Sequence, residues 1–284
     1  MNTTLRSTIQ LLRFHFSFLL MPVYWFALSR VENIHWNKAV LIFVILHLLV
    51  YPASNGYNSY MDRDTSPIGG VAHPLQPTKQ LLYVTSVMNI MALALSFFIS
   101  FFFAVGIFLY ILASLAYSYR GIRLKKYPYT GYLTVILFQG ALTFYLVYHG
   151  SGGSSDPLPF WGMLASALLI GGAYPITQVY QHEADKNDGV TTLSYLLGIK
   201  GTFFFTGIVY AFAFLVLGWM YYLHEPGSFI ILLCCMLPVI LYFSAWFARV
   251  IKNKSQANYK NTMRMNLLAS VCTNLGFFIL LIIK

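Results

Sequence analysis

The sequence predicts an all-α, polytopic membrane protein with nine transmembrane helices. Of its 284 residues, 58% are hydrophobic and only 9% are charged, whereas about 25% of the residues in a soluble domain are charged. Apolar runs of roughly 18–23 residues recur along the whole chain, and this is the length that crosses the hydrocarbon core of a bilayer. The few charges gather in short segments between these runs.

The apolar runs define the predicted spans in order. The first begins near Leu11 and is as long as its successors, so we expect a retained span and not a cleaved signal peptide. The third and fourth runs almost fuse, and we expect a tight turn near Ser100 between them. A Gly-, Ser- and Pro-rich loop (149–159) separates the fifth run from the sixth. The runs cover about 11–29, 38–57, 81–99, 101–118, 130–149, 159–180, 202–223, 228–248 and 265–283.

The lysines and arginines orient these spans. With the N-terminus in the cytoplasm, all but three of the 18 fall in cytoplasmic segments, the exceptions being Arg30, Lys38 and Lys284. This bias follows the positive-inside rule and favours an odd number of spans. The basic residues behind the formal charge of +10 are therefore expected to determine the membrane topology. They are also expected to contact anionic headgroups or a phosphorylated substrate, and not nucleic acid. The small chain and its compact loops suggest a bacterial inner membrane.

Five of the eight acidic residues fall in two short stretches, NSYMDRD (58–64) and QHEADKND (181–188). Each stretch follows an even-numbered span, so both are expected at the cytoplasmic surface. A carboxylate near the bilayer centre costs about 2.5–3.5 kcal/mol on insertion scales and less near the interface. Their concentration at two points therefore indicates a function. The alternative is that both stretches are solvated helix ends with caps and local salt bridges.

The spacing within the two stretches predicts a metal site. Asn58 and Asp62 are four residues apart and share one face if the second helix continues through them, with Asn55 one turn further back. Gln181 and Asp185 repeat this spacing at the end of the sixth helix. Facing each other, these oxygen-rich ends suit Mg²⁺, which prefers oxygen ligands and usually keeps waters and substrate phosphates in its shell. The expected ligands are Asn58, Asp62, Asp64, Gln181, Glu183, Asp185 and Asp188.

A basic stretch, YSYRGIRLKKYPYTG (117–131), follows the fourth span on the same predicted side. Four cations interleave with four tyrosines there. A positive-inside loop is the simpler interpretation, but arginine also offers a planar fork of donors to phosphate oxygens. Acids that bind Mg²⁺ beside cations that bind phosphate form a diphosphate site. The expected diphosphate-binding residues are Tyr117, Arg123, Lys125, Lys126 and Lys186.

These motifs resemble those of the UbiA superfamily of intramembrane aromatic prenyltransferases. NSYMDRDTS matches the family's Asn-x-x-x-Asp-x-x-x-Asp motif through Asn58 and Asp62. EADKNDGVTTL resembles the motif Glu-Gly-Asp-x-x-x-Gly-x-x-Thr-Leu, YSYRGIRLKKYP resembles Tyr-Ser-x-Pro-Pro-x-Arg-Leu-Lys, and HPLQP resembles Arg-Pro-Leu-Pro. The likeness spans nearly the whole chain in order and spacing. The chain departs from it at Ser66 and Gln181, where the family has acids, and at Ser59.

The resemblance implies one domain over 1–284, with the helices in a bundle around a central cavity. It also implies Mg²⁺-dependent transfer of a prenyl group from a polyprenyl diphosphate to an electron-rich, aromatic or otherwise lipophilic acceptor within the membrane. Asp62 and Asp185 would be the catalytic residues, and the metal site would hold two Mg²⁺ ions. Gln139, inside the fifth span, is expected to make either an interhelical hydrogen bond or a contact with the acceptor.

Three other functions are compatible with the sequence. Ser66 and Gln181, at positions where the family has acids, make a non-catalytic isoprenoid-binding member credible. An isoprenoid cyclase would also release diphosphate but would yield no coupled product. An ion-coupled transporter fits least well, because it would place a charged residue within a span, whereas the acids here cluster at helix ends.

Overall fold

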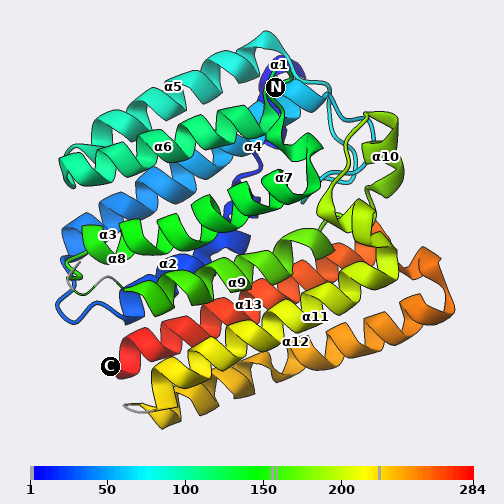
Figure 1. Cartoon of the computed structure of the whole chain (residues 1–284). Coiled ribbons are helices and arrows are strands. Elements are labelled where there is room, and N and C mark those ends of the chain that lie inside the picture. Colours follow the sequence, from blue (N-terminus) through cyan, green and yellow to red (C-terminus); the bar gives the residue numbers. More distant parts are fainter. Residues whose placement is uncertain (1–2, 155–156, 158, 223–224) are drawn as a thin grey trace.

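The computed structural model describes residues 3–154, 157, 159–222 and 225–284. Apart from one isolated β-bridge between Ile68 and Val71, the regular structure of this part of the chain is helical, which confirms the all-α prediction. Figure 1 shows the long helices lying side by side, with the short helix α10 (His182–Asn187) at one end of the bundle.

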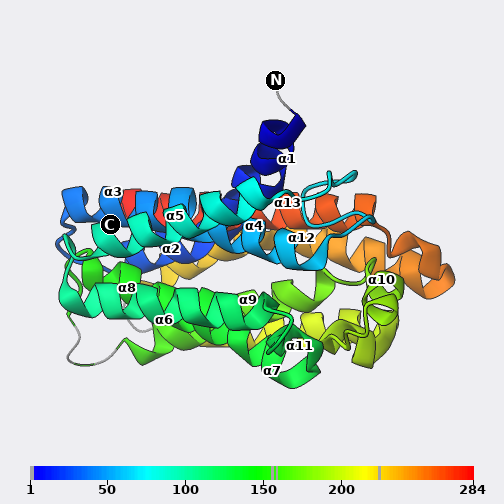
Figure 2. The ribbon, with the colours of Figure 1, turned by 90° about the horizontal axis from the view of Figure 1, so that it is seen from above.

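The first two long rods each consist of three consecutive helical segments. The first contains α1 (Thr3–Leu12), the 3₁₀ segment η1 (Phe14–Leu20) and α2 (Met21–Ser29). The second contains α3 (Trp36–Phe43), the π segment η2 (Val44–Val50) and α4 (Tyr51–Asp62). The first rod begins earlier than predicted, and Figure 2 shows α1 projecting from the bundle. Arg13 interrupts this rod with a left-handed backbone, φ 49°.

The third and fourth rods are single helices, α5 (Lys79–Ser96) and α6 (Phe101–Ser118). The turn expected near Ser100 is confirmed, because Ser100 is the N-cap of α6 and its hydroxyl accepts a hydrogen bond from the N–H of Phe103 at 3.0 Å. A serine in this position satisfies one of the N–H groups that a helix start leaves unpaired.

The fifth rod again has a π segment at its middle. It contains α7 (Pro128–Val135), η4 (Ile136–Leu142) and α8 (Thr143–Gly150). The sixth helix, α9 (Phe160–Ile176), ends before the predicted residue 180, one residue after Pro175, which lacks a backbone N–H. Residues 155–156 and 158 of the predicted loop lie outside the described residues.

Three long helices complete the chain: α11 (Leu193–Tyr222), α12 (Pro226–Lys252) and α13 (Tyr259–Ile283). The element α11 begins at Leu193, but its backbone is non-helical at Gly198, so it consists of a short first helix and a long second one that starts close to the predicted residue 202. Gly198 kinks it with φ 66°, a conformation that glycine adopts without a steric penalty. The predicted end of this span at 223 lies outside the described residues.

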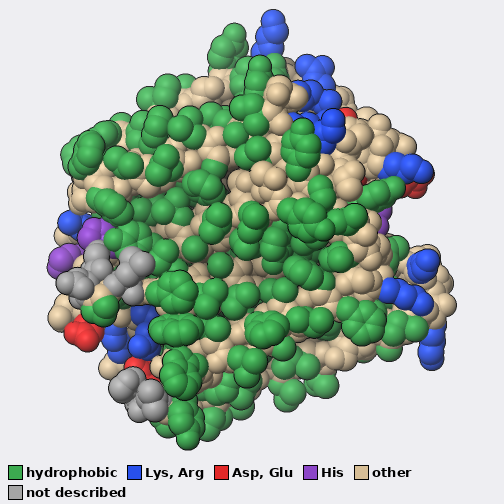
Figure 3. Space-filling view, viewed as in Figure 1, with side chains coloured by type: hydrophobic (Ala, Val, Ile, Leu, Met, Phe, Trp, Pro, Cys, Tyr) green, Lys and Arg blue, Asp and Glu red, His purple; other side chains and the backbone are tan. Residues whose placement is uncertain are grey.

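Seven of the rods in the described residues combine the length and apolar composition of a membrane span. They are the rods 3–29, 36–62, 101–118, 128–150, 193–222, 226–252 and 259–283. The helices α5 and α9 correspond to the third and sixth predicted spans but are not among these seven. The helix α9 has only 17 residues. The multi-pass architecture is thus confirmed, whereas the count of nine spans stays a prediction. In Figure 3, apolar side chains cover most of the visible face, and most visible Lys and Arg lie along its right-hand edge.

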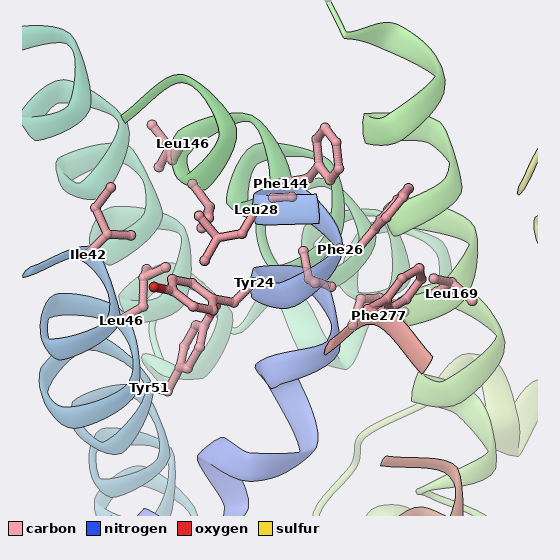
Figure 4. Close-up of a cluster of buried hydrophobic side chains, with 14 of the residues drawn as sticks. Tyr24, Phe26, Leu28, Ile42, Leu46, Tyr51, Phe144, Leu146, Leu169 and Phe277 are labelled. Carbon is pink, nitrogen blue, oxygen red and sulfur yellow. The ribbon is translucent and has the colours of Figure 1, made fainter. Parts of the chain in front are cut away.

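A cluster of aromatic and aliphatic side chains holds the rods together (Figure 4). Phe26 of α2 stacks on Phe277 of α13, with ring centroids 4.6 Å apart, and also packs against Phe144 of α8. The Tyr24 hydroxyl donates to the carbonyl of Ala39 in α3 at 2.8 Å. Close packing of this kind is the main attraction between helices in lipid, and here it fixes the relative positions of the helix ends.

Candidate active site

The first acidic stretch lies at the end of α4. Asn58 and Asp62 share one face of this helix, as predicted. The Asn58 amide oxygen accepts from Ser118 of α6 at 2.9 Å and from the Lys125 ammonium at 3.5 Å. The Asp62 side chain is 5% exposed and forms ion pairs with Lys125 and, at 3.6 Å, with Arg123. Asp62 is therefore a buried carboxylate with two cationic neighbours.

The second acidic stretch lies on α10, a helix separate from α9. Gln181 is its N-cap, and the Asp185 N–H donates to the Gln181 carbonyl at 2.8 Å. The predicted i,i+4 relation therefore holds, although the prediction that the sixth helix itself carries it is wrong. The Asp185 carboxylate accepts from the Thr192 hydroxyl at 3.4 Å. Asp188 forms ion pairs with Arg120, at 3.3 Å, and with Arg123.

The basic stretch connects the two acidic stretches. Arg123 adopts a left-handed backbone, φ 53°, is 8% exposed, and pairs with both Asp62 and Asp188. Arg120 reaches the end of α4 and donates to the carbonyl of Met61 at 2.7 Å. The loop between α6 and α7 therefore brings together two acidic stretches that are more than 100 positions apart in the sequence.

These elements enclose a cavity of about 240 Å³. Eight of the predicted site residues line it: Asn58, Asp62, Asp64, Tyr117, Lys125, Gln181, Asp185 and Asp188. Arg123 lies beside the cavity and reaches it through its ion pairs. Glu183, Lys186 and Lys126 are exposed and do not line it. The structure therefore separates the predicted set into nine residues that line or adjoin the cavity and three that do not.

Two carboxyl groups of the cavity titrate close to neutrality. Burial, reinforced by the charge of Asp62, raises the pKa of Asp64 from 3.8 to about 6. Burial also raises the pKa of Asp185 to about 7, and Lys125 opposes this shift. The pKa of Asp188 is lowered, because its hydrogen bond and ion pair to Arg123 outweigh the effect of burial. The cavity thus holds acids that lose their protons readily when a cation arrives.

The donor atoms of the cavity fit Mg²⁺. Carboxylate and amide oxygens from both acidic stretches face one space, and Asp62 Oδ1 is buried without a hydrogen-bond partner. Within the described residues, no three His, Cys, Asp or Glu side chains are gathered closely enough to hold an ion by themselves. Mg²⁺ commonly binds through one or two carboxylates together with substrate phosphates, so this arrangement suits a metal that arrives with a phosphorylated ligand.

Beyond the charged residues the cavity is lined by neutral polar and aromatic groups. The Tyr117 and Tyr174 hydroxyls are hydrogen-bonded to each other, and Gln178 donates to Tyr174 at 3.0 Å. Gln139 of η4 lines this cavity and also a neighbouring, mostly apolar one of about 140 Å³. Tyr110 of α6 lines the same cavity as Gln139, and the choice between an interhelical hydrogen bond and an acceptor contact for Gln139 stays a prediction.

Several cavity residues do not follow from the sequence motifs. Tyr174 and Gln178 lie four residues apart at the end of α9 and the following turn, and this spacing was an available signal. Arg13 lines the cavity and is only 7% exposed, although in the sequence it is simply one of the orienting cations. No local pattern distinguishes Arg13, because its position depends on how the first rod packs against α4.

Sequence and structure comparisons identify related proteins. The profile of the UbiA prenyltransferase family matches residues 19–268, whereas no curated protein sequence matches the chain. A UbiA homologue from Archaeoglobus fulgidus bound to GPP and Mg²⁺ is similar in structure, with a TM-score of 0.72, 17% identity, and coverage of 97% of this chain and 99% of that chain.

Two further solved structures have the same fold. The apo structure of a UbiA homologue from Aeropyrum pernix K1 has a TM-score of 0.71 at 16% identity and covers 94% of this chain and 98% of its own. A structure described as that of digeranylgeranylglyceryl phosphate synthase has a TM-score of 0.63 at 19% identity and covers 100% of both chains. At such identities the likeness establishes the fold.

Proposed function

Since the chain belongs to the UbiA prenyltransferase family, we propose that it transfers a prenyl group from a polyprenyl diphosphate to an electron-rich, aromatic acceptor within the membrane. The proposal treats residues 1–284 as one catalytic domain. One observation carries it: both acidic stretches and Lys125 line a single cavity. The Archaeoglobus homologue bound to GPP and Mg²⁺ supports the same class of donor and the same metal here.

We assign metal binding to oxygen donors from both acidic stretches. Asn58, Asp62 and Asp64 would contribute from the α4 side, and Gln181 and Asp185 from the α10 side. Bound there, Mg²⁺ would supply a Lewis acid that lowers the energy of negative charge on the departing diphosphate. Asp188, already paired with two arginines, would act mainly by holding those arginines in place.

The cations of the α6–α7 loop would bind the diphosphate. Lys125 and Arg123 contact Asp62, so their positive charge is already at the mouth of the cavity. Fixed donors aimed at the diphosphate stabilise the charge that develops as the allylic C–O bond breaks. The bonding electron pair leaves with the diphosphate, a carbon of the acceptor forms the new C–C bond, and the acceptor then loses a proton.

The inner part of the cavity suits the organic half of the reaction. Tyr110, Phe138 and Tyr174 line it, and the face of an aromatic ring attracts a cation such as the allylic carbocation. The hydroxyls and amides there are uncharged, so they can orient an acceptor without competing as strong nucleophiles. A cation held against these rings would be less accessible to water, which would otherwise quench it.

The test is product analysis with matched variants. Membranes that contain the protein are incubated with geranyl, farnesyl or longer diphosphates, a panel of phenolic acceptors, and either Mg²⁺ or EDTA, and products are identified by mass spectrometry. Asp62→Asn and Asp185→Asn should each lower Mg²⁺-dependent product formation by at least about 100-fold. Glu32→Gln, which alters an exposed acid between α2 and α3, serves as the control and should leave the rate unchanged.

The outcomes separate the alternatives. Full activity in both Asp variants would contradict the metal assignment. Diphosphate release without a coupled product would favour a cyclase. Folded protein that binds a donor but never releases diphosphate would favour a non-catalytic binder. In that case Ser66, a cavity residue where the family has an acid, would be the first position to change, by Ser66→Asp.

A further inference from the structure

A chain of hydrogen bonds in the wall of the larger cavity joins Gln178, Tyr174 and Tyr117. The Gln178 side-chain nitrogen Nε2 donates to the Tyr174 hydroxyl at 3.0 Å, and this hydroxyl is hydrogen-bonded to that of Tyr117. All three residues line the cavity. The chain connects the end of α9 to α6. The reaction proposed above uses the ring of Tyr174 but neither its hydroxyl nor Gln178.

The hydrogens of this chain can be counted. An amide nitrogen only donates, whereas a phenol hydroxyl has one hydrogen to donate and an oxygen that accepts. One of the two tyrosine hydrogens is used in the bond between Tyr117 and Tyr174. Within the described part of the chain, no group besides Gln178 bonds to either hydroxyl. One phenol hydrogen is therefore left for a ligand in the cavity.

The direction of the chain favours Tyr117 as the residue that holds this hydrogen. Gln178 donates to Tyr174, and a hydroxyl that accepts a hydrogen bond becomes a stronger donor in turn. An arrangement in which Tyr174 donates to Tyr117 is therefore favoured over one in which Tyr174 accepts twice. Gln178 is only 7% exposed, so its amide is largely shielded from water that would compete for the bond.

Tyr117 lies at the charged end of the cavity. The next residue, Ser118, donates to the Asn58 amide oxygen at 2.9 Å, and Asn58 lies one turn before Asp62 on the same face of α4. Tyr174, by contrast, lines both cavities, so it lies where the charged space and the mostly apolar space meet. A hydrogen held on Tyr117 is thus at the end of the chain where the diphosphate would bind.

We propose that Tyr174 and Gln178 are positioning residues, which direct the Tyr117 hydroxyl hydrogen toward an oxygen of the donor diphosphate. The inference rests on the proposed function, since it concerns the leaving group of that reaction. When the allylic C–O bond breaks, the electron pair leaves with the diphosphate, and a donor already oriented toward it stabilises the added charge without first turning. The proton of Tyr117 stays on its oxygen, so Tyr117 acts as a hydrogen-bond donor and not as an acid.

The first measurement is the calorimetric titration of purified protein in detergent with inorganic pyrophosphate and Mg²⁺, without turnover. Tyr117→Phe should weaken binding by about tenfold or more, the effect of losing a hydrogen bond to a charged group. Tyr174→Phe keeps the ring and removes only the hydroxyl, and should weaken binding by about threefold or more.

The matched control is Tyr24→Phe. The Tyr24 hydroxyl also belongs to a buried residue and is also hydrogen-bonded, to the Ala39 carbonyl at 2.8 Å, but Tyr24 lines neither cavity. Its loss should leave the pyrophosphate affinity within about twofold of wild type. If Tyr174 served stability alone, Tyr174→Phe would lower Tm, as Tyr24→Phe should, and would leave the pyrophosphate affinity unchanged.

Two further variants test whether Tyr174 acts through Tyr117. Adding Tyr174→Phe to Tyr117→Phe should weaken binding no further, because the hydrogen that Tyr174 directs is already gone. Gln178→Met has a similar length but no N–H donor, so its pyrophosphate affinity should fall between those of wild type and Tyr174→Phe.

The same order of variants should appear in turnover. In Tyr174→Phe, kcat for diphosphate release should fall while the KM for the donor changes little, because the hydrogen bond strengthens as charge develops. Tyr174→Phe with wild-type pyrophosphate affinity, or with a loss that is equally large in the Tyr117→Phe background, overturns the inference. Because pyrophosphate binding is measured without catalysis, protein that binds in the expected order but transfers no prenyl group would count against the proposed function and not against the positioning role.

Discussion

The charged residues of the cavity neutralise one another. Asp62 pairs with Lys125 and Arg123, and Asp188 pairs with Arg120 and Arg123. A diphosphate alone would be repelled by the carboxylates, and a metal cation alone would be repelled by the lysine and the arginines. A diphosphate together with its cation matches both sets, because each new charge replaces a partner that an existing residue gives up. The proposed function would thus account for the interleaving of acids and bases.

Arg63 positions one of these acids through its backbone. It adopts φ 55° directly after Asp62, and its N–H donates to the Ser59 carbonyl at 3.0 Å, which closes the end of α4. The chain then turns so that Asp64 lines the same cavity as Asp62. The same segment, which connects α4 to α5, is also held by His15, whose ring forms a 3.0 Å hydrogen bond with the Gly70 carbonyl.

The raised pKa values of Asp64 and Asp185 predict a pH dependence. Their pKa values of about 6 and about 7 exceed the ordinary 3.8, so the folded protein favours the protonated forms. The stability these groups contribute is present at low pH and is lost as pH rises through 6 and 7. In the proposed assignment Mg²⁺ binds the ionised forms of Asp64 and Asp185, so its stabilising effect should grow over the same range.

Thermal unfolding at several pH values measures this effect. Between about pH 5.5 and about pH 8, the rise in Tm caused by Mg²⁺ with pyrophosphate should increase, because each proton released makes a carboxylate available as a ligand. Asp185→Asn should remove the part of the change centred near pH 7. A Mg²⁺ effect on Tm that stays constant from pH 5.5 to 8 would contradict the assignment of these carboxyl groups as ligands.

At the level of elements, the two π segments lie in the rods that contact the cavity. Wide turns of this type occur often at functional sites. The segment η4 carries Gln139, which lines both cavities, and the next residue, Gly140, allows α9 to pack closely. A Cβ added to Gly140 would lie 2.6 Å from Ala167 Cα and 2.9 Å from the Ser166 carbonyl oxygen. The neighbouring atoms are main-chain atoms, so they cannot rotate away.

Gly140→Ala should therefore separate η4 from α9 and lower the thermal stability. Overpacking of this kind typically costs about 1–3 kcal/mol, which corresponds in a chain of this size to a fall in Tm of about 2 °C or more. The control is Gly227→Ala, since nothing lies within 4 Å of a Cβ at Gly227 near the start of α12. Equal Tm values for the two variants, measured by thermal unfolding in detergent, would show that the η4–α9 contact is looser than the structure indicates.

At the level of the whole molecule, the charge distribution predicts the orientation in the membrane. The site-bearing end holds Arg63 and the α6–α7 loop, whereas Glu32 lies in the loop between α2 and α3 at the other end of the second rod. The proposed topology places the N-terminus and the site in the cytoplasm of a bacterial cell.

Cysteine labelling in intact cells tests this orientation. In a background with Cys234, Cys235 and Cys272 replaced by Ala, Glu32→Cys should react with a membrane-impermeant maleimide from outside. Arg63→Cys should react only after the membrane is permeabilised, because the positive-inside rule holds its loop on the cytoplasmic side. Labelling of Arg63→Cys in intact cells would reverse the proposed topology.

The sequence by itself determined the class of fold and the positions of most of the charged residues that line the cavity. Apolar runs identify membrane helices because a span needs a minimum length of apolar residues whatever surrounds it. The acids at 58–64 and 181–188 are recognisable because carboxylates are rare in such a chain. The turn at Ser100 is expected because the third and fourth apolar runs almost fuse, and the structure adds that Ser100 caps its own helix.

Only the tertiary structure decided which residues of these stretches face the cavity and which face water. Lys125 pairs with Asp62 while the adjacent Lys126 is exposed, and Asp185 lines the cavity while Glu183 does not. Arg13 joins the site only because the first rod packs against α4. Lys125 and Lys126 are the same residue type, and Glu183 and Asp185 are both acids, so local sequence does not distinguish the members of either pair. The difference arises from packing between segments far apart in the sequence, which no local pattern encodes.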